Sequence, residues 1–376
     1  MKNGNAFIPA LNIGVGTPRQ DILSILDTGS SDLWVPQTGS RLCRDIQQQC
    51  TGTTFSTNSY SSINSTTSSE ITTPAFYTSY VNGVEINGSF VRESVAFGNT
   101  TTTSVQIGVG TDGTLPSSLF PIAGLGYKNF EGIVEKGETP YDNTVAGMKS
   151  AGLINSTAFG LYLNDFRSEE GSIVFGGYDT AKFNGSLKSV PLVPDNDNRI
   201  TTFYIKWDTF EFEAGDTQKS KSRRATCLNM APPQGLPAAL IDSGDPAWTL
   251  SEDILTRMGE ALNLRVVDGT LESLKCSVGN SGAKFTFGFN QGVKIEVPIS
   301  MLMVPLTNAN GAAVFDQQGD TMCQLPVEIG GSGTGTLGAP FLQAAYVVFD
   351  MDRNQLLMAP AIMNATTSNI QEYITS

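Results

Sequence analysis

Two aspartates follow short apolar runs, one in each half of the chain, and each begins a turn-like tripeptide. The run 22–26 ends in Asp27-Thr28-Gly29, and the run 238–241 ends in Asp242-Ser243-Gly244. A short apolar run is typical of a buried strand, so each carboxylate is expected at the C-terminal end of a strand. A single tripeptide of this kind more often marks a turn than a catalytic site, so the pairing carries the argument.

A pair of adjacent carboxylates has a definite chemistry. Two carboxylates about 3 Å apart cannot both ionise cheaply, so they share one proton over a wide pH range. The ionised member takes a proton from a water held between them, and the protonated member polarises the carbonyl under attack. The sequence therefore predicts hydrolysis by a water activated between Asp27 and Asp242.

The composition fits chemistry that uses carboxylates alone. The 376 residues include no histidine, which excludes Ser–His and Cys–His nucleophiles and histidine-bound metals. The five cysteines form no close CxxC pattern, so a thiolate zinc site is not expected. We therefore expect no metal and no cofactor.

The formal net charge of −13 bears on partners. An acidic chain repels a phosphate backbone, so nucleic acid is not expected as a partner. The acidity suits low pH, where protonation removes self-repulsion, but it also simply keeps a protein soluble, and both interpretations stay open. Apolar runs fall well short of the ~20 residues of a transmembrane helix, so no membrane span is expected.

The two halves of the chain repeat a spacing. Gly124 of Ile122-Ala123-Gly124 lies 97 residues after Asp27, and Gly338 of Thr336-Leu337-Gly338 lies 96 residues after Asp242. Glycine-rich turns between short apolar runs indicate strands. We predict an all-β chain of two duplicated lobes, 1–177 and 178–376. Helical spacing predicts one helix in each lobe, over 144–154 and from a cap at Ser251 to Leu262.

The stretch Asp27 to Pro36 (DTGSSDLWVP) resembles the N-lobe active-site segment of the pepsin family (A1) of aspartic proteases. Residues 7–20, with their Gly-Thr-Pro turn, are similar to the opening strand of that family. Residues 338–350 are similar to its last strand pair. The resemblance extends along nearly the whole chain, and fungal secreted and yapsin-like members look most similar. It implies a bilobal all-β acid protease fold with a central cleft.

The resemblance also implies an activity and partners. The chain would be an aspartic endopeptidase that cuts extended polypeptides at acidic pH and binds pepstatin-like inhibitors. A monomer is expected. The third possibility is a carbohydrate-active enzyme, which also uses two carboxylates. Its acid and base would need to lie about 5–9 Å apart, and that function does not explain two matching loops.

Several residues take support roles by the same resemblance. The hydroxyls of Thr28 and Ser243 would cross to the backbone of the opposite loop, and Gly29 and Gly244 would leave room for the substrate backbone. The hydroxyl of Ser30 would support the first carboxylate. The residues implied to support the pair are Thr28, Gly29, Ser30, Ser243, Gly244 and Asp245.

Residues 76–95 resemble the flap, a hairpin that closes over the cleft of the family. Tyr80, just before Asn82-Gly83, would be the flap tyrosine, with its hydroxyl directed to the indole nitrogen of Trp34. An ordinary cross-strand aromatic is the alternative for Tyr80. The main apolar subsite of the family would be lined by Ile25, Leu119 and Ile122, for which core packing is the alternative.

Cysteines and glycosylation triplets indicate an oxidising compartment. The resemblance implies the disulfides Cys43–Cys50 and Cys276–Cys323. Cys227 is then either a free buried thiol or bonded to a partner outside this sequence. Acceptor triplets for N-glycosylation begin at Asn64, Asn87, Asn99, Asn155, Asn184 and Asn364.

We expect a secreted glycoprotein made as a zymogen, located outside the cell, at the cell surface or in a vacuole. No signal peptide is visible ahead of the first strand-like run. We therefore expect the signal and pro-segment to be absent from this sequence, with Met1 at the start of a trimmed form.

The second tripeptide departs from the family pattern. Ser or Thr is expected after Gly244, but the chain has Asp245-Pro246. At ~6 Å and an effective dielectric constant of ~20, a third carboxylate would repel the pair by ~3 kcal/mol, or ~2 pKa units. Asp245 is therefore expected either to stay protonated and donate a hydrogen bond or to turn toward solvent. The alternative function is a catalytically impaired, pepsin-like binding protein.

Overall fold

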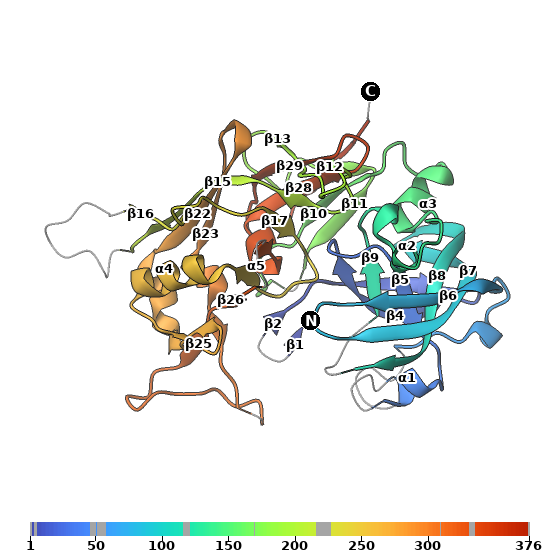
Figure 1. Ribbon diagram of the computed structural model, residues 1–376, viewed down its shortest axis with the longest axis horizontal. Helices are drawn as coiled ribbons and strands as arrows, with labels where there is room; N and C mark the ends of the chain where they lie inside the picture. Colours follow the sequence, from blue (N-terminus) through green and yellow to red (C-terminus); the bar gives the residue numbers. More distant parts are fainter. Residues whose placement is uncertain are drawn as a thin grey trace, which may run out of the picture. The chain divides into compact units, whose positions relative to one another are not determined.

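A computed structural model of the chain describes residues 2–3, 6–45, 50, 58–115, 121–168, 170–215, 227–308, 310–330 and 335–374. It divides into two compact units, which we call the N-terminal unit (Pro9–Thr157) and the C-terminal unit (Met1–Ile8 and Ala158–Ser376). Strands dominate both units (Figure 1), as the sequence predicted.

The division falls about 20 residues before the expected one at residue 177. The reason is β10 (Ala158–Tyr162), which pairs with β28 (Ala345–Asp350) near the end of the chain. Residues 158–177 therefore belong to the C-terminal unit.

The N-terminal unit is built on a seven-stranded sheet with the order β3-β4-β9-β5-β8-β7-β6. Its strands are β3 (Ala10–Val15), β4 (Gln20–Asp27), β5 (Leu33–Pro36), β6 (Ser69–Ser79), β7 (Glu85–Phe97), β8 (Thr100–Thr114) and β9 (Ile122–Gly124). Its short helices are α1 (Arg41–Arg44), α2 (Gly132–Glu135) and α3 (Thr144–Ser150), with 3-10 turns η1 (Ser62–Asn64) and η2 (Lys128–Phe130).

A strand crossing near its centre gives this sheet an unusual order. Strand β9 lies between β4 and β5, parallel to β4 with Asp27 opposite Gly124 and antiparallel to β5 with Trp34 opposite Ile122. The loop from Asp27 to β5 must therefore pass across the end of β9. Asp27, the last residue of the largely buried strand β4, therefore lies at the crossing.

A seven-stranded sheet in the C-terminal unit, in the order β14-β17-β27-β18-β26-β20-β19, contains the same crossing. Strand β27 is parallel to β17, with Ile241 opposite Leu337, and antiparallel to β18, with Trp248 opposite Leu337. The strands are β14 (Tyr204–Ile205), β17 (Ala239–Ile241), β18 (Trp248–Leu250), β19 (Val266–Val267), β20 (Thr270–Leu271), β26 (Val327–Ile329) and β27 (Gly335–Leu337). Thus the predicted duplication is present in the topology of each unit.

The remaining strands of the C-terminal unit form smaller sheets. A five-stranded sheet adds β11 (Ser172–Phe175), β13 (Lys188–Pro191) and β29 (Gln355–Pro360) to β10 and β28, and a four-stranded one contains β15 (Trp207–Glu213), β16 (Cys227–Asn229), β22 (Lys284–Phe289) and β23 (Val293–Pro298). The others are β1 (Lys2–Asn3), β2 (Ala6–Phe7), β12 (Gly177–Asp179), β21 (Leu274–Lys275), β24 (Val304–Pro305), β25 (Met322–Gln324) and β30 (Ile370–Glu372). Helices α4 (Glu252–Leu262) and α5 (Ala339–Leu342) and the 3-10 turns η4 (Cys276–Ser281), η5 (Asn290–Gly292) and η6 (Ile299–Leu302) complete it.

Aromatic side chains hold the second crossing against the four-stranded sheet. Trp248 of β18 is fully buried and meets Phe285 and Phe287 of β22 edge-on, with ring centroids 5.8 and 4.9 Å apart. Such edge-to-face pairs add about 0.5–1.5 kcal/mol each to the burial of their apolar area. The strand that follows the Asp242 loop is thereby fixed by the core behind it.

The two predicted helices differ in how well the sequence placed them. Helix α4 matches its prediction and buries one apolar face. Ser251 occupies its N-cap position, but the side chain makes no capping hydrogen bond, so that expectation was wrong. Helix α3 ends at Ser150 rather than 154, because Ala151 and Gly152 close the last turn.

Both implied disulfides, Cys43–Cys50 and Cys276–Cys323, are present. Cys227 is free and exposed on β16, which contradicts the alternative of a buried thiol. The alternative of a partner outside this sequence stays a prediction. All six acceptor asparagines of the glycosylation triplets are exposed, which leaves them accessible to modification. No helix among the described residues is long and apolar enough to cross a membrane.

The two disulfides should contribute unequally to stability. Cys276–Cys323 closes a loop of 47 residues and Cys43–Cys50 a loop of 7. In the chain-entropy description, removing them costs roughly 4 and roughly 2 kcal/mol. Denaturant unfolding of the two Cys→Ala pairs should show the larger loss for Cys276 and Cys323; equal losses would contradict the loop-length account.

Candidate active site

The Asp27 carboxylate is buried at the end of β4, with 6% of the residue exposed. The backbone N–H of Gly29 donates to Oδ1 at 2.8 Å, and the hydroxyl of Ser30 donates to Oδ2. Two donors of its own loop thus fix the orientation of this carboxylate. The support role implied for Ser30 stays a prediction.

The Asp242 carboxylate follows β17 and repeats the first of these contacts. It is half-buried, and the N–H of Gly244 donates to Oδ1 at 2.7 Å. Gly29 and Gly244 therefore make equivalent bonds in the two units. Thr28 and Ser243 are both buried beside the aspartates. Their hydrogen bonds to the opposite loop stay a prediction.

Asp245 stands where Ser30 stands in the other loop, three residues after the aspartate. Its Oδ1 accepts from the N–H of Ala247 at 2.8 Å, and its Oδ2 accepts from the hydroxyl of Thr249 at 3.0 Å. Asp245 is half-buried rather than turned fully to solvent, and both oxygens accept bonds within its own loop.

A glycine lies beneath each loop at the strand crossing. The N–H of Gly124 donates to the carbonyl of Asp32 at 3.1 Å, and the N–H of Gly338 donates to the carbonyl of Ala247, also at 3.1 Å. A Cβ on Gly124 would lie 2.6 Å from the backbone of Ser31 and Asp32, and one on Gly338 would collide with the carbonyls of Asp245 and Ala247. Only glycine lets the backbones approach this closely.

Strands β6 and β7 form the hairpin that the sequence predicted over 76–95 (Figure 1). In its turn the N–H of Tyr80 donates to the carbonyl of Val84 and the N–H of Gly83 donates to the carbonyl of Tyr80, and Gly83 adopts a φ of 81°. The side chain of Asn82 accepts from the N–H of Val84 at 3.2 Å. Val81 is fully exposed at the tip, as expected for a residue on a lid.

The expected hydrogen bond between Trp34 and Tyr80 is present. The indole Nε1 of Trp34 donates to the Tyr80 hydroxyl at 2.8 Å, although the two residues lie on different strands of the sheet. Loss of hydration raises the Tyr80 pKa, and the carboxylates of Asp27 and Asp32 raise it further. Tyr80 therefore stays protonated and keeps a proton to donate while it accepts from Trp34.

The three predicted subsite residues have unequal outcomes. Ile25 and Ile122 are direct neighbours in the parallel pair of β4 and β9, and both are buried. Both side chains therefore pack in the core at the crossing. Their predicted role in lining the apolar subsite stays a prediction. Leu119 lies outside the described residues.

Sequence reasoning missed a cluster of buried acids next to the Asp27 loop. Asp32 is 3% exposed, and its carboxylate accepts from the hydroxyl of Tyr141 at 2.7 Å and from the N–H of Gly132 at 2.8 Å. Glu131 is completely buried and accepts from the N–H of Tyr141 at 2.9 Å. Its other oxygen has no hydrogen-bond partner within the described residues.

Burial dominates the protonation of both acids. It raises the pKa of Asp32 to about 6, against the opposing effect of bonds from Gly132 and Tyr141. It raises the pKa of Glu131 to about 9, with a further increase from the Asp32 charge. Asp32 could have been noticed as the second acid of the stretch DTGSSDLW that carries the family resemblance, but the local sequence around Glu131 carries no signal of burial.

Comparisons with known proteins agree with this geometry. A family model described as "Eukaryotic aspartyl protease" matches residues 10–361, which is nearly the whole chain. The chain belongs to the eukaryotic aspartyl proteases. The pepsin-like resemblance of the sequence is thereby confirmed.

Two fungal aspartyl proteases illustrate the relationship. The "Probable aspartic-type endopeptidase opsB" of Aspergillus oryzae is 32% identical over 364 residues, which cover 96% of this chain and 70% of that protein. "Secreted aspartic protease 3" of Candida albicans is 32% identical over 365 residues, which cover 96% and 81%. The expected similarity to fungal members is confirmed.

A solved aspartyl protease shows the fold. The aspartic proteinase from Irpex lacteus matches with a TM-score of 0.68 and 20% identity, covering 96% of this chain and 99% of that one. The chain therefore has the bilobal, mostly β fold of pepsin-like aspartic endopeptidases. The comparisons give no support to the alternative of an impaired binding protein.

The crossing glycines should be the least replaceable residues of the site. Gly124→Ala or Gly338→Ala places a Cβ against backbone atoms that cannot move without breaking the loop. We expect each to lower the free energy of unfolding by at least about 2 kcal/mol. Gly147→Ala in α3 is the control, since its Cβ has only one neighbour, at 3.6 Å, and alanine favours helix. Denaturant unfolding in which all three variants behave alike would contradict this account.

Proposed function

We propose that this aspartic endopeptidase hydrolyses peptide bonds with a water held between Asp27 and Asp242. The observation that carries the proposal is the repeated local geometry. In each unit a buried strand ends in an aspartate, the N–H of the glycine two residues later binds its Oδ1, and a glycine crosses beneath the loop. Two such loops supply two equivalent carboxylates, as a shared-proton pair needs.

The chemistry follows from one proton shared by two carboxylates. Asp27 accepts two hydrogen bonds in its own loop and suits the ionised role of general base toward water. The protonated partner donates to the scissile carbonyl and stabilises the oxygen as it becomes negative. The proton taken from water passes to the leaving amine, and the pair is ready for another turnover. The pair must hold one proton, so the optimum is expected at acidic pH.

Polypeptides are the substrate class of pepsin-like proteases. For this chain we propose an extended peptide beneath the hairpin of β6 and β7. The Trp34–Tyr80 hydrogen bond supports a flap role for that hairpin, because it ties a residue next to the turn to the strand that follows the Asp27 loop. Ile25 and Ile122 stay candidates for the apolar subsite. Pepstatin-like inhibitors and a monomeric state belong to the same proposal.

Secretion is the compartment that we propose. Two disulfides and six exposed acceptor asparagines suit an oxidising, glycosylating pathway. The Candida albicans relative carries the word "secreted" in its name. Retention at the cell surface or in a vacuole would involve the same pathway.

Asp27→Asn and Asp242→Asn should each remove nearly all peptide cleavage while leaving the fold intact. Each change ends the shared-proton pair without changing side-chain volume, and general acid–base catalysis contributes about 10²–10⁴-fold. Asp21→Asn, an exposed acid on β4, is the matched control and should keep its activity. Peptide cleavage above about a tenth of the parent rate in either active-site variant would refute the pair.

Asp245→Thr should move the descending limb of the pH–rate profile to lower pH. Asp245 lies three residues after Asp242 and accepts from Ala247 and Thr249, and we propose that it acts on the pair as a negative charge at neutral pH. A neighbouring anion holds the shared proton on the pair, and its removal lets that proton leave earlier. An unmoved limb in a peptide-cleavage assay would mean that Asp245 has no electrostatic influence on the reaction.

A further inference from the structure

Asp32 joins two parts of the N-terminal unit that flank the Asp27 loop. It lies five residues after Asp27 and two before Trp34, whose indole binds Tyr80 near the flap turn. Its carboxylate is bound from the other side by Gly132 and Tyr141. A single buried carboxylate therefore connects the active-site loop to the segment 131–141.

The segment 131–141 supports the base of the flap hairpin. The ring of Tyr141 meets Phe90 of β7 edge-on at 5.4 Å, and Phe90 meets Phe76 of β6 edge-on at 5.2 Å. Gly132, the first residue of α2, lies so close to β6 that a Cβ there would collide with the carbonyl of Tyr77. Lys136 lies over the ring of Tyr77 at 3.9 Å. Movement of this segment would therefore move both flap strands.

The side chain of Glu131 binds the backbone of Tyr141. Oε2 accepts from the N–H of Tyr141, so the backbone and the hydroxyl of Tyr141 are bound by two different buried acids. Within the described part of the chain no hydrogen bond or ion pair joins a basic side chain to either acid: Lys128, whose charge opposes the raised pKa of Glu131, is bound to Asp142 at 2.9 Å and is half exposed. The arrangement is built from acids and their hydrogen-bond donors alone.

We propose that Asp32 and Glu131 are positioning residues for peptide hydrolysis, acting through Tyr141 as a proton-operated anchor of the flap base. The anchor holds when both acids are protonated and loosens as they ionise. Its existence rests on the contacts within the N-terminal unit; its effect on catalysis rests on the function proposed above.

The sign follows from linkage. An acid whose pKa is raised by a closed arrangement favours that arrangement at low pH, and ionisation favours any state that lets water reach it. The pKa is raised to about 6 for Asp32 and to about 9 for Glu131. Among the described residues, the charged and titratable groups that act on the two acids are Tyr80, Glu135, Tyr141, Asp142 and Lys128, and Asp27 acts on Tyr80 beside them. Lys128 is the one base in this set.

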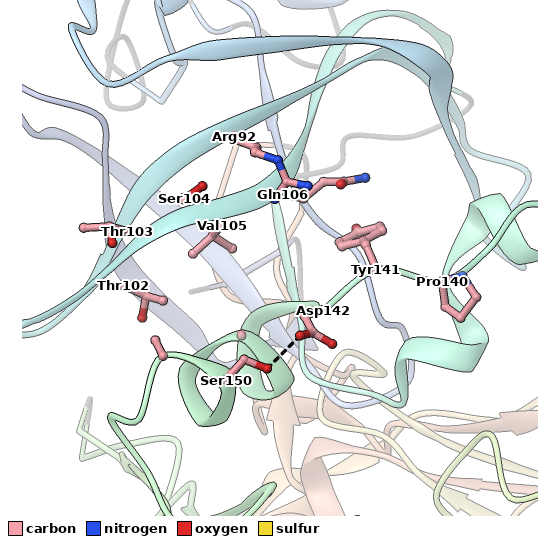
Figure 2. Close-up of a pocket in the computed structure, with 12 residues that line it drawn as sticks. Arg92, Thr102, Thr103, Ser104, Val105, Gln106, Pro140, Tyr141, Asp142 and Ser150 are labelled. Carbon is pink, nitrogen blue, oxygen red and sulfur yellow. Dashed lines mark hydrogen bonds between the residues drawn. The ribbon is translucent and has the colours of Figure 1, made fainter.

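A pocket of about 630 Å³ provides the route by which water can reach the acids. Tyr141 forms part of its wall together with Gln106 and Arg92 of β8 and β7, and Ser150 of α3 binds Asp142 at the opposite side (Figure 2). Tyr141 thus lines the pocket while its hydroxyl donates to Asp32. Rotation of Tyr141 into the pocket would hydrate Asp32 and remove the ring from Phe90.

Hydrogen exchange of single amides tests the anchor without reference to catalysis. The N–H groups of Gly132 and Tyr141 donate to the two acids, so their opening constants report on the anchor directly. After correction for the intrinsic exchange rate, opening should increase about a hundredfold per pH unit between pH 4.5 and 6, where both acids release protons. Between pH 6 and 9 it should increase about tenfold per unit, through Glu131 alone.

Isosteric variants separate the two acids. Asp32→Asn should leave a tenfold increase per unit over the whole range, and Glu131→Gln should leave opening flat above pH 6. The double variant should be flat throughout. Glu138→Gln is the matched control, an exposed acid of the same segment, and should keep the slopes of the parent. Slopes in the double variant equal to those of the parent would overturn the proposal.

Amides at the strand crossing distinguish a local anchor from global stability. The N–H of Leu125, bound to the carbonyl of Asp27, belongs to the core of the same unit. It should exchange more slowly than those of Gly132 and Tyr141 and with a weaker pH dependence. Equal opening constants and slopes at all three amides would mean that the unit unfolds as a whole, and the anchor would be refuted.

Kinetics then test whether the anchor positions the flap. Asp32→Leu, which cannot bind Tyr141 or Gly132, should raise the KM for a peptide at pH 4.5 about tenfold more than Asp32→Asn does, with a smaller difference in kcat. The KM of the parent should increase between pH 4.5 and 6.5, and that of the Asn variant should increase less. Equal KM values for Leu and Asn would refute the positioning role. Should Asp27→Asn stay active while the exchange slopes hold, the proposed catalytic pair would fail and the anchor would stand.

Discussion

Each aspartate depends on a place where two stretches of backbone nearly touch. A strand ends at the aspartate, the chain passes over a glycine of the neighbouring strand, and it returns as a strand on the far side of that neighbour. Because the crossing leaves no space for a Cβ at Gly124 or Gly338, the loop above is fixed by backbone contacts rather than by side chains. Side chains around the loop are then free to differ between the units, as Ser30 and Asp245 do.

That division between backbone and side chain explains what the sequence could predict. The two tripeptides and their matching glycine spacings predicted two duplicated lobes, since each lobe needs an apolar run, an aspartate and a glycine at set distances. The strand crossings themselves were not predicted. The Trp34–Tyr80 bond was also predicted, because the resemblance covers both residues. The unit boundary was less accessible: β10 belongs to the C-terminal unit through its pairing with β28, which local sequence does not report.

The buried acids could not be predicted for a related reason. Asp32 and its partner Tyr141 are 109 residues apart, and neither local sequence indicates that the two side chains are in contact. Glu131 lies in a segment of mixed polar and apolar residues that reads as a surface turn, yet it is completely buried. Cys227 shows the opposite case, since one of the two alternatives for it was a buried thiol and it is exposed on an edge strand. Tertiary packing decides whether a single polar residue is buried. A pattern of residue types predicts the average burial of a segment, not that of each residue in it.

The completely buried Glu131 also changes how the charge of the protein should be counted. The formal value of −13 treats every acid as ionised, but burial keeps Glu131 protonated at pH 7. The folded chain therefore carries one proton more than its unfolded form, which exposes the same carboxyl to water. Unfolding at pH 7 is a proton-releasing reaction, and the heat measured in a calorimeter includes the heat with which the buffer takes up that proton.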